Sequence, residues 1–275
     1  DKELQDSTPT DFKTIDAQKV KAVVEKIDAA IKDKPISKTF KQKLNYVRKN
    51  YENNLEKYAK QEAILGENRT SYSKTDNDAT FMRMKEDHMK NGQLKPAYNV
   101  QASTNNQFVV NYTLHQNTTD TNTLIPHTEQ YKQCYNTTPA SQTTDAGYGS
   151  EENYEYLQQN NITGYVKYSH FDREQNETIQ SKKPFTADKL FYNESQDYFV
   201  CPMGQKMNNI GTHTQKTSTG FKQTITNYQA KNCSICPLNG VCHKSKGNRI
   251  ISINYNLNKL KQQARGNLQS EKGIA

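Results

Sequence analysis

Apolar residues recur at helical spacing through the first quarter of the chain. Between residues 16 and 33, one face of the expected helix collects Val20, Val23, Val24, Ile27 and Ile31. Pro35 ends this helix, and Ser37 is suited to cap the next one. The second stripe continues to about residue 63 through Phe40, Leu44, Val47, Tyr51, Leu55 and Tyr58. Two helices joined by a short turn predict an antiparallel helical hairpin over residues 1–65.

The pattern changes to alternation near residue 98. Residues 98–102 and 108–114 alternate around an Asn-rich turn, which predicts a β-hairpin. Helical spacing returns in residues 120–134, where one side carries Leu124, Ile125, Thr128 and Tyr131. The later elements are a strand at 140–144, a helix at 150–159, a strand at 162–168 and a helix with Leu257, Leu260, Ala264 and Leu268. Strands followed by alternating helices and strands predict an α/β fold with a mixed sheet.

Composition narrows the class of protein. Only 32% of the 275 residues are hydrophobic and Trp is absent, so the core is expected to be small. No apolar run approaches the roughly 18 residues of a membrane span, and no signal-peptide pattern opens the chain. Five cysteines are too few for a disulfide scaffold, which favours a reduced, cytosolic protein without a membrane partner. The net charge of +8 suits a polyanionic partner.

One carboxylate, that of Asp145, lies at a position where α/β folds commonly place functional residues. Asp145 follows the predicted strand at 140–144, and Gly147 and Gly149 loosen the turn after it. Ser150 is a suitable N-cap for the next helix, whose first residues are acidic, as the helix dipole favours. The carboxyl ends of strands in α/β sheets border the crevice where ligands bind. Asp145 is therefore a candidate catalytic residue, with an ordinary acid in a capped turn as the alternative.

Residues 145–154, with the sequence DAGYGSEENY, resemble the motif around the second catalytic Asp of bacterial insertion-sequence transposases of the Asp-Asp-Glu type. Further blocks match this family in order: 75–87, 95–101, 165–168, 198–204 and 232–249. The resemblance covers roughly residues 70–273. It departs at Asn77, where the family usually has Pro, and at Ala97, where it usually has Gly.

The resemblance implies a ribonuclease H-like fold with a mixed sheet and flanking helices. Its domains would be the helical hairpin at 1–65, a partial catalytic core at 66–185 and 250–275, and a Cys-rich insertion at 186–249. Residues 140–144 are polar, whereas the family has aliphatic residues there. Either this strand lies near a sheet edge, or the sequence has drifted.

The resemblance also implies an enzyme that cleaves and joins DNA with two Mg²⁺ or Mn²⁺ ions held by three carboxylates. Only Asp145 matches one of the three. The first carboxylate normally lies in Asp-Gly-Thr, and no Asp-Gly occurs here. The third normally follows the stretch matched by residues 270–273. We therefore expect an internal fragment of a transposase that is inactive alone. Other acids that could substitute are Asp76, Asp78, Glu86, Asp87, Glu151 and Glu152, of which Asp76 and Asp78 lie in a family motif.

Four cysteines predict a second metal site. Cys201 precedes a cluster with Cys-x2-Cys-x5-Cys spacing, formed by Cys233, Cys236 and Cys242. A predicted hairpin at 221–228 would bring the distant cysteine to the cluster. Four thiolates favour structural zinc or an iron–sulfur cluster, with free thiols as the alternative. His243 could replace one cysteine, although a surface position is commoner, and Cys134 is expected apart from the cluster as a small buried residue.

Basic residues surround the cysteines and continue into the last helix. Those that suit phosphate contacts are Lys231, Lys244, Lys246, Arg249, Lys259, Lys261 and Arg265. They predict double-stranded DNA as the partner. The resemblance implies that this DNA is the ends of the mobile element and that the complete protein could be a homodimer in the bacterial nucleoid. Two alternatives remain: a DNA-binding remnant without catalysis, and a nuclease outside the family whose Cys spacing resembles an iron–sulfur staple.

Overall fold

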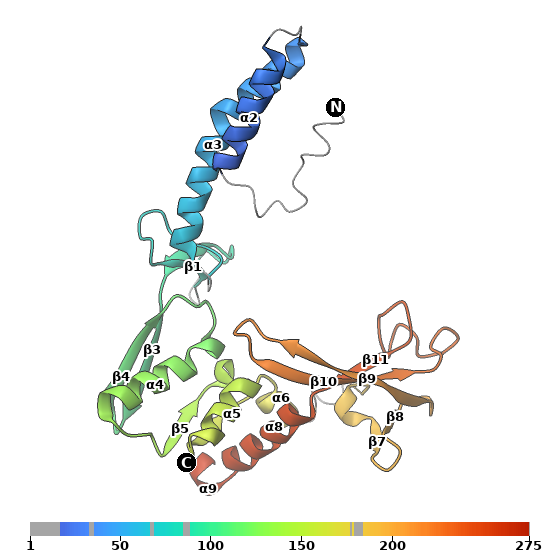
Figure 1. The fold of residues 1–275 in the computed structure, drawn as a ribbon. Coiled ribbons are helices and arrows are strands. Elements are labelled where there is room, and N and C mark those ends of the chain that lie inside the picture. Colours follow the sequence, from blue (N-terminus) through green and yellow to red (C-terminus); the bar gives the residue numbers. More distant parts are fainter. Residues whose placement is uncertain are drawn as a thin grey trace. The chain divides into compact units, whose positions relative to one another are not determined.

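The computed structural model describes residues 17–32, 36–66, 69–84, 89–176, 178 and 184–274. These residues form two compact units, 1–98 and 99–275, and Figure 1 shows the helices and strands of each. Helices and strands occur in both units. The chain is therefore mixed α/β, as its pattern of apolar residues predicts.

The first unit begins with two long helices that lie side by side (Figure 1). They are α2 (Ala17–Ile31) and α3 (Lys38–Leu65), which confirms the two predicted helices. The side chain of Ser37 accepts a hydrogen bond from the Phe40 amide at 3.2 Å, so it is the N-cap. Arg48 of α3 forms an ion pair with Asp28 of α2.

The same unit ends in a small antiparallel sheet of β1 (Thr80–Arg83) and β2 (Leu94–Ala97). Arg69 connects this part to α3, because its guanidinium donates to the carbonyls of Leu65 at 3.0 Å and Asn77 at 2.7 Å. The boundary between the two units follows residue 98, so residues 69–98 belong to the same unit as the two helices.

The second unit opens with the predicted hairpin, formed by β3 (Asn99–Asn105) and β4 (Phe108–His115). A short 3₁₀ turn, η2 (Asp120–Asn122), then leads into α4 (Leu124–Tyr135). Next, β5 (Ser141–Thr144) pairs in parallel with β6 (Thr163–Val166), and α5 (Glu151–Gln159) connects them. The strand β5 is half-exposed and has a single partner among the described strands, which agrees with an edge position.

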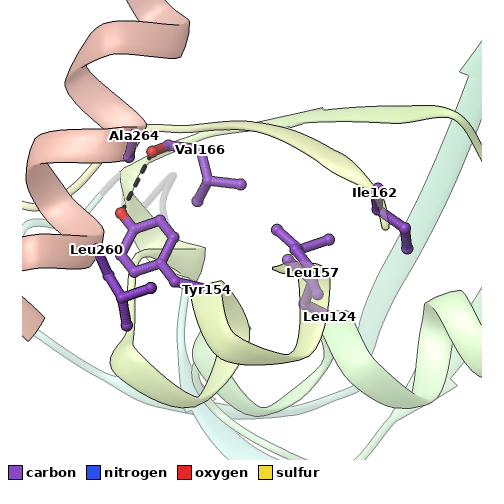
Figure 2. Packing of buried hydrophobic residues seen from close by; sticks show 7 residues of the cluster. All are labelled: Leu124, Tyr154, Leu157, Ile162, Val166, Leu260 and Ala264. Carbon is purple, nitrogen blue, oxygen red and sulfur yellow. Dashed lines mark hydrogen bonds between the residues drawn. The ribbon is translucent and has the colours of Figure 1, made fainter. Parts of the chain in front are cut away.

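A hydrophobic cluster joins the helices of this unit to β6 (Figure 2). Its buried members are Leu124, Tyr154, Leu157, Ile162, Val166, Leu260 and Ala264. The last two lie on α8 (Tyr255–Leu268), the predicted final helix. Because the Tyr154 hydroxyl donates to the Val166 carbonyl at 3.2 Å, this buried ring is satisfied at its polar end as well.

The Cys-rich segment folds as a five-stranded antiparallel sheet with the strand order β11-β10-β9-β8-β7. Its strands are β7 (Phe191–Asn193), β8 (Tyr198–Val200), β9 (Lys206–Lys216), β10 (Lys222–Ala230) and β11 (Ile250–Ile253). The pairing of β9 with β10 confirms the predicted hairpin. The sheet has its own cluster of buried residues, including Phe199, Met207 and Tyr228. Short helical elements complete the unit: η3 (Ala146–Tyr148), α6 (Phe171–Glu174), η4 (Ala187–Lys189) and α9 (Glu271–Ile274).

Two sequence expectations need correction. Among the described strands, β3–β4 and β5–β6 form separate two-stranded sheets, so the expected single mixed sheet is not formed. Cys134, expected to be buried, is exposed. It lies in the last turn of α4, whereas the buried residues Leu124, His127 and Thr128 lie in the first two turns.

None of the helices in the described part of the chain combines the length and the apolarity that a membrane span needs.

The turn between β5 and α5 depends on Gly149. A Cβ atom at this position would lie 2.5 Å from the Lys167 carbonyl oxygen and 2.9 Å from the Tyr168 Cα. We expect Gly149→Ala to lower the free energy of unfolding by about 1–3 kcal/mol, as overpacking does. The control is Gly266→Ala in α8, where no atom would crowd the new methyl group and helix propensity predicts a gain of up to about 1 kcal/mol. Equal effects in denaturant unfolding would contradict this account.

Candidate active site

Asp145 lies directly after β5 and caps the short turn η3. Its Oδ1 accepts a hydrogen bond from the Gly147 amide at 2.8 Å. The residue is exposed and borders a cleft of about 570 Å³ between β3 and β5. The local sequence explains the geometry, because the Asp side chain caps one turn and Ser150 caps α5 through the Asn153 amide at 3.2 Å.

A second carboxylate, Asp120, lies beside Asp145, and the sequence analysis did not single it out. A Cβ atom built on Gly147 would lie 3.0 Å from the Asp145 Oδ1 and 3.3 Å from the Asp120 Oδ2. The two side chains thus flank Gly147. The sequence pattern does not single out Asp120, because an acid at a helix start is usually explained by the helix dipole. The sequence signal for Asp120 lies in the family-matching block 95–101. This block contains Asn99 and Gln101, whose side chains hold Asp120.

Two amides from β3 hold Asp120. The Asn99 Nδ2 donates to its Oδ1 at 2.8 Å, and the Gln101 Nε2 donates to the same oxygen at 3.1 Å. Gln101 in turn accepts from the Tyr148 hydroxyl. Burial raises the pKa of Tyr148 to about 12, with a further contribution from the charges of Asp120 and Asp145. Tyr148 therefore keeps its proton at neutral pH and donates a hydrogen bond in this network.

Asn153 fixes the two acid-bearing turns relative to each other. It is buried, and its Nδ2 donates to the carbonyls of Thr121 at 2.8 Å and Tyr148 at 2.7 Å. The Thr121 hydroxyl also donates to the Gly147 carbonyl at 2.9 Å. The separation of Asp120 and Asp145 is therefore set both by Asn153 of α5 and by the direct bond between the two turns.

The other candidate acids have structural roles or lie elsewhere. Asp76 accepts from the Tyr98 hydroxyl at 2.8 Å and belongs with Asp78 to the first unit. Glu86 and Asp87 lie outside the described residues. Glu152 accepts from the Thr219 hydroxyl at 2.6 Å.

Glu151 is the most buried of these acids, with 3% of its surface exposed. Its carboxylate accepts from Gln223 of β10 at 2.9 Å and from Asn254 and Asn256 at the start of α8, at 2.6 and 2.8 Å. These bonds satisfy the buried charge. Glu151 therefore connects the five-stranded sheet and α8 to α5, and it does not face the cleft beside Asp145.

The acids that the structure describes do not complete a two-metal centre. No group of three or more His, Cys, Asp or Glu side chains in the described ranges is arranged to hold a metal ion. Beside Asp145 the donor set consists of two carboxylates, and one oxygen of each already accepts hydrogen bonds. Two metal ions need more oxygen ligands than this pair offers.

The four clustered cysteines line one small cavity of about 20 Å³ with His243 and Arg249. The amide of Gln205 donates to the Cys201 Sγ at 3.3 Å, and the amide of Arg249 donates to the Cys233 Sγ at 3.4 Å. The sequence prediction that these cysteines lie together agrees with this cavity. Their sulfur atoms are nevertheless not arranged as ligands of one ion in the described residues.

His243 differs from the surface residue that the sequence suggested. Its Nδ1 lies 2.7 Å from the Ser245 Oγ, whereas its buried Nε2 has no hydrogen-bond partner among the residues the structure describes. This orphan nitrogen belongs to a residue of the cysteine cavity. A ligating His commonly has its second ring nitrogen held by a hydrogen bond, and the pair His243–Ser245 has this form.

The basic residues expected to bind DNA fall into two groups. Four are exposed lysines: Lys231, Lys244, Lys246 and Lys259. The others are engaged within the protein. Arg249 is buried, and its guanidinium donates to the Cys242 Sγ at 2.9 Å and to the Phe185 carbonyl. Arg265 pairs with Glu174, and the Lys261 Nζ lies 5.4 Å from the centre of the Tyr168 ring.

Comparison with protein families identifies the class of protein. A family model described as "Transposase DDE domain" matches residues 69–234, and a second model with this description matches residues 200–275. The first match covers more than half of the chain, so the protein belongs to the DDE transposase family. No curated protein and no solved structure matches the chain.

His127 of α4 forms part of the cleft wall and should make stability depend on pH. It is buried between the Ser103 Oγ at 2.6 Å and the Thr113 Oγ1 at 2.7 Å. Burial lowers its pKa, and the charge of His115 lowers it further. The neutral ring is therefore the folded form, and the unfolded chain binds more protons below its pKa of about 6.5.

We expect the free energy of unfolding to fall as the pH drops below about 6.5, by at most about 1.4 kcal/mol per pH unit for this one group. His127→Gln should remove this part of the dependence in urea unfolding at pH 5 and pH 7.5. His170→Gln, at an exposed position, is the control and should leave the dependence unchanged. Burial also lowers the pKa of His115, so a smaller dependence should remain in His127→Gln, and an undiminished dependence would contradict the assignment to His127.

Proposed function

We propose that this chain is the central part of a bacterial insertion-sequence transposase with a ribonuclease H-like catalytic core. The observation that carries the proposal is the position of Asp145, at the end of a strand and beside a cleft, in a chain of the DDE family. Mg²⁺ or Mn²⁺ bound there would activate the attacking oxygen and stabilise the leaving oxygen of a phosphodiester. Asp145 would supply an anionic oxygen to these ions.

The remaining carboxylates come from outside residues 1–275 in this proposal. It is supported by the incomplete donor set beside Asp145 and by the lack of an Asp-Gly pair in the sequence. Asp120 adds negative charge next to Asp145, and Asn99 and Gln101 hold it in place. The chain by itself would then bind DNA without cutting it. The complete protein would act in the cytoplasm, at the nucleoid, with a homodimer as its proposed form.

Double-stranded DNA is the proposed partner, and the exposed lysines 231, 244, 246 and 259 are the proposed phosphate contacts. Arg249 is not among them, because its buried guanidinium donates to Cys242 and Phe185. Lys261 and Arg265 are not among them either, because they contact Tyr168 and Glu174 within the protein. A DNA-binding remnant without catalysis is the second candidate function. The observation that favours it is the same incomplete set of acids.

The test of catalysis compares this chain with a transposase in which both flanking segments are restored. The 275-residue chain should not cut duplex DNA with Mg²⁺ or Mn²⁺, whereas the restored protein should. In the restored protein, Asp145→Asn should lower cleavage at least about a hundredfold, since an amide cannot supply the anionic ligand and each 1.4 kcal/mol is a factor of ten. Asp172→Asn, at an exposed ion pair with Lys167, is the control and should keep full activity.

Binding is measured in the same proteins without metal. Affinity for duplex DNA should fall steeply with salt in wild type and in Asp145→Asn alike, because phosphate contacts release counterions. Cleavage by the 275-residue chain, lost in its Asp145→Asn variant, would show that all ligands lie within these residues. Absence of cleavage in the restored protein would favour the second candidate function, a DNA-binding remnant without catalysis.

A structural metal is proposed at the cysteine cavity, with zinc ahead of an iron–sulfur cluster. Support comes from the four cysteines around one cavity, from the peptide N–H groups directed at Cys201 and Cys233, and from the unpartnered Nε2 of His243 within the described residues. Thiolate ligands accept such N–H bonds, and a tetrahedral ion with four thiolates needs sulfur at about 2.3 Å. The sulfur atoms would have to move together on binding.

Elemental analysis of the purified chain tests this site. We expect about one zinc ion per chain in wild type and in Cys134→Ser, the exposed cysteine outside the cavity. Cys233→Ser should lose the metal and unfold more easily, because metal binding contributes to folding. Iron in the protein, together with absorption of visible light, would identify an iron–sulfur cluster in place of zinc. Retention of the metal in Cys233→Ser would refute the cysteine site.

A further inference from the structure

The long strand β9 of the five-stranded sheet has a free edge over most of its length. One side of β9 pairs with β10 at residues 207–216, whereas β8 pairs with the other side only at residues 206–208. Beyond residue 208, none of the strands that the structure describes lies on this second side. Residues 209–216 are all exposed, so their outward backbone N–H and C=O groups can pair with another strand.

A β-bulge bounds the regular part of this edge. The pairing of β9 with β10 shifts at Asn227 and Tyr228 and leaves Ile210 without a cross-strand partner. Gly211 follows with a φ of 123°, and its amide donates to the Asn209 Oδ1 at 2.8 Å. Because a bulge bends the strand, regular pairing can start only after it. Residues 211–216, called the β9 edge below, have the length of an ordinary strand.

The hairpin that carries the β9 edge is fixed at both ends. At its base, β9 and β10 are part of the five-stranded sheet (Figure 1). Near its tip, the Thr219 hydroxyl donates to Glu152 at 2.6 Å, and the Gln223 side chain donates to Glu151 at 2.9 Å. Both acids lie on α5. A partner strand would therefore meet a preformed edge, and the entropy cost of ordering this edge on binding is small.

The β9 edge lacks the usual protection of a free strand. Residues 211–215 are Gly, Thr, His, Thr and Gln, and Lys216 is the single charged residue of the edge. Proteins commonly protect long free edges with several charged residues or with Pro, because such edges otherwise pair with other chains. An exposed, regular and nearly uncharged edge is thus suited to pairing with a further strand.

The geometry of antiparallel pairing limits how this edge can meet its own copy. Two residues that lie opposite each other must both direct their backbone groups at the partner or both direct them away. These directions alternate along a strand, so a strand that pairs with its own copy has one residue opposite itself. The two longest registers within the β9 edge place His213 or Thr214 at this position.

Both registers are chemically self-complementary. With His213 at the centre, Thr212 lies opposite Thr214 of the second copy, and Thr–Thr pairs stabilise sheets. With Thr214 at the centre, Thr212 lies opposite Lys216 of the second copy. Neither register places two charges of the same sign opposite each other. Pairing of the edge with itself also occupies both free edges, so the assembly closes as a dimer, whereas pairing with a different edge would continue into a fibre.

We propose that the β9 edge pairs antiparallel with the same edge of a second copy, around a two-fold axis at His213 or Thr214. The two five-stranded sheets would then form one continuous sheet. This inference gives an interface to the homodimer of the proposed function and rests on that function for the role of the dimer. The pairing itself follows from the free edge, its fixed ends and its sequence.

Sedimentation velocity of the whole chain tests the association. The average mass should rise with protein concentration from 31.5 kDa towards twice this value and no further. Because each copy carries a net charge of +8, association should strengthen as salt rises from about 0.05 to 0.3 M and screens the repulsion. A chain that stays monomeric, or a mass that keeps rising beyond the dimer, would overturn the proposal.

A charge exchange at the axis locates the interface. The double variant His213→Lys/Thr214→Lys places two lysines opposite each other in either register and should weaken association at least about fivefold. The variant His213→Glu/Thr214→Glu should have the same effect, and an equal mixture of the two variants should recover the dimer. The control Ser218→Lys/Thr224→Lys adds the same charge at exposed positions of the hairpin outside the edge and should change association by less than about twofold in 0.3 M salt.

The variants are compared after circular dichroism has shown that each is folded. Equal weakening by the control, or a mixture of the Lys and Glu variants that stays monomeric, would show that the copies do not meet at this edge.

Amide hydrogen exchange distinguishes strand pairing from other contacts. Dimerisation should protect every second amide of residues 211–216, because only alternate N–H groups point outward. Protection that is present in the dilute monomer would show that the chain covers its own edge, and protection confined to other residues would show a different interface. Either result would overturn the proposal.

DNA binding by the same proteins separates this inference from the proposed function. The Lys and Glu double variants should both retain salt-sensitive binding of duplex DNA, since the proposed phosphate contacts lie elsewhere. A wild-type dimer that does not bind DNA would contradict the function and leave the strand pairing intact. A wild-type monomer that binds DNA would refute the pairing alone.

Discussion

The buried carboxylate of Glu151 is the interaction on which the second unit depends. It accepts hydrogen bonds from β10 and from two residues at the start of α8, while its own backbone begins α5. A buried charge is tolerated only when such donors satisfy it. Because α5 also carries Asn153, which fixes the turns of Asp120 and Asp145, the same short helix links the five-stranded sheet to the site.

The site combines a rigid frame with an incomplete centre. The turns that carry the two acids are held by capping and by Asn153, and α4 holds the strands that flank the cleft. The carboxylates beside Asp145 are too few for two metal ions among the described residues.

The local elements could be predicted because their causes are local. Ser37 and Ser150 cap helices through amides three residues away, and the stripe on α4 follows from its own spacing. Asp120 could not be found in this way, because its partners Asn99 and Gln101 lie on the strand β3, about twenty residues earlier. Cys134 was expected to be buried and is exposed, because its place relative to the core is set by packing rather than by residue type.

The sequence alone determined the family, the order of the helices and strands, the place of Asp145 in the turn after a strand and the spacing of the four cysteines. Motifs and periodicity are properties of neighbouring residues. Only the tertiary structure decided which residues meet. It placed Asp120 next to Asp145, buried the guanidinium of Arg249 against Cys242 and left β3 and β5 with free edges among the described strands. These features depend on contacts between residues far apart in the chain, and such contacts follow from packing and hydrogen-bond satisfaction.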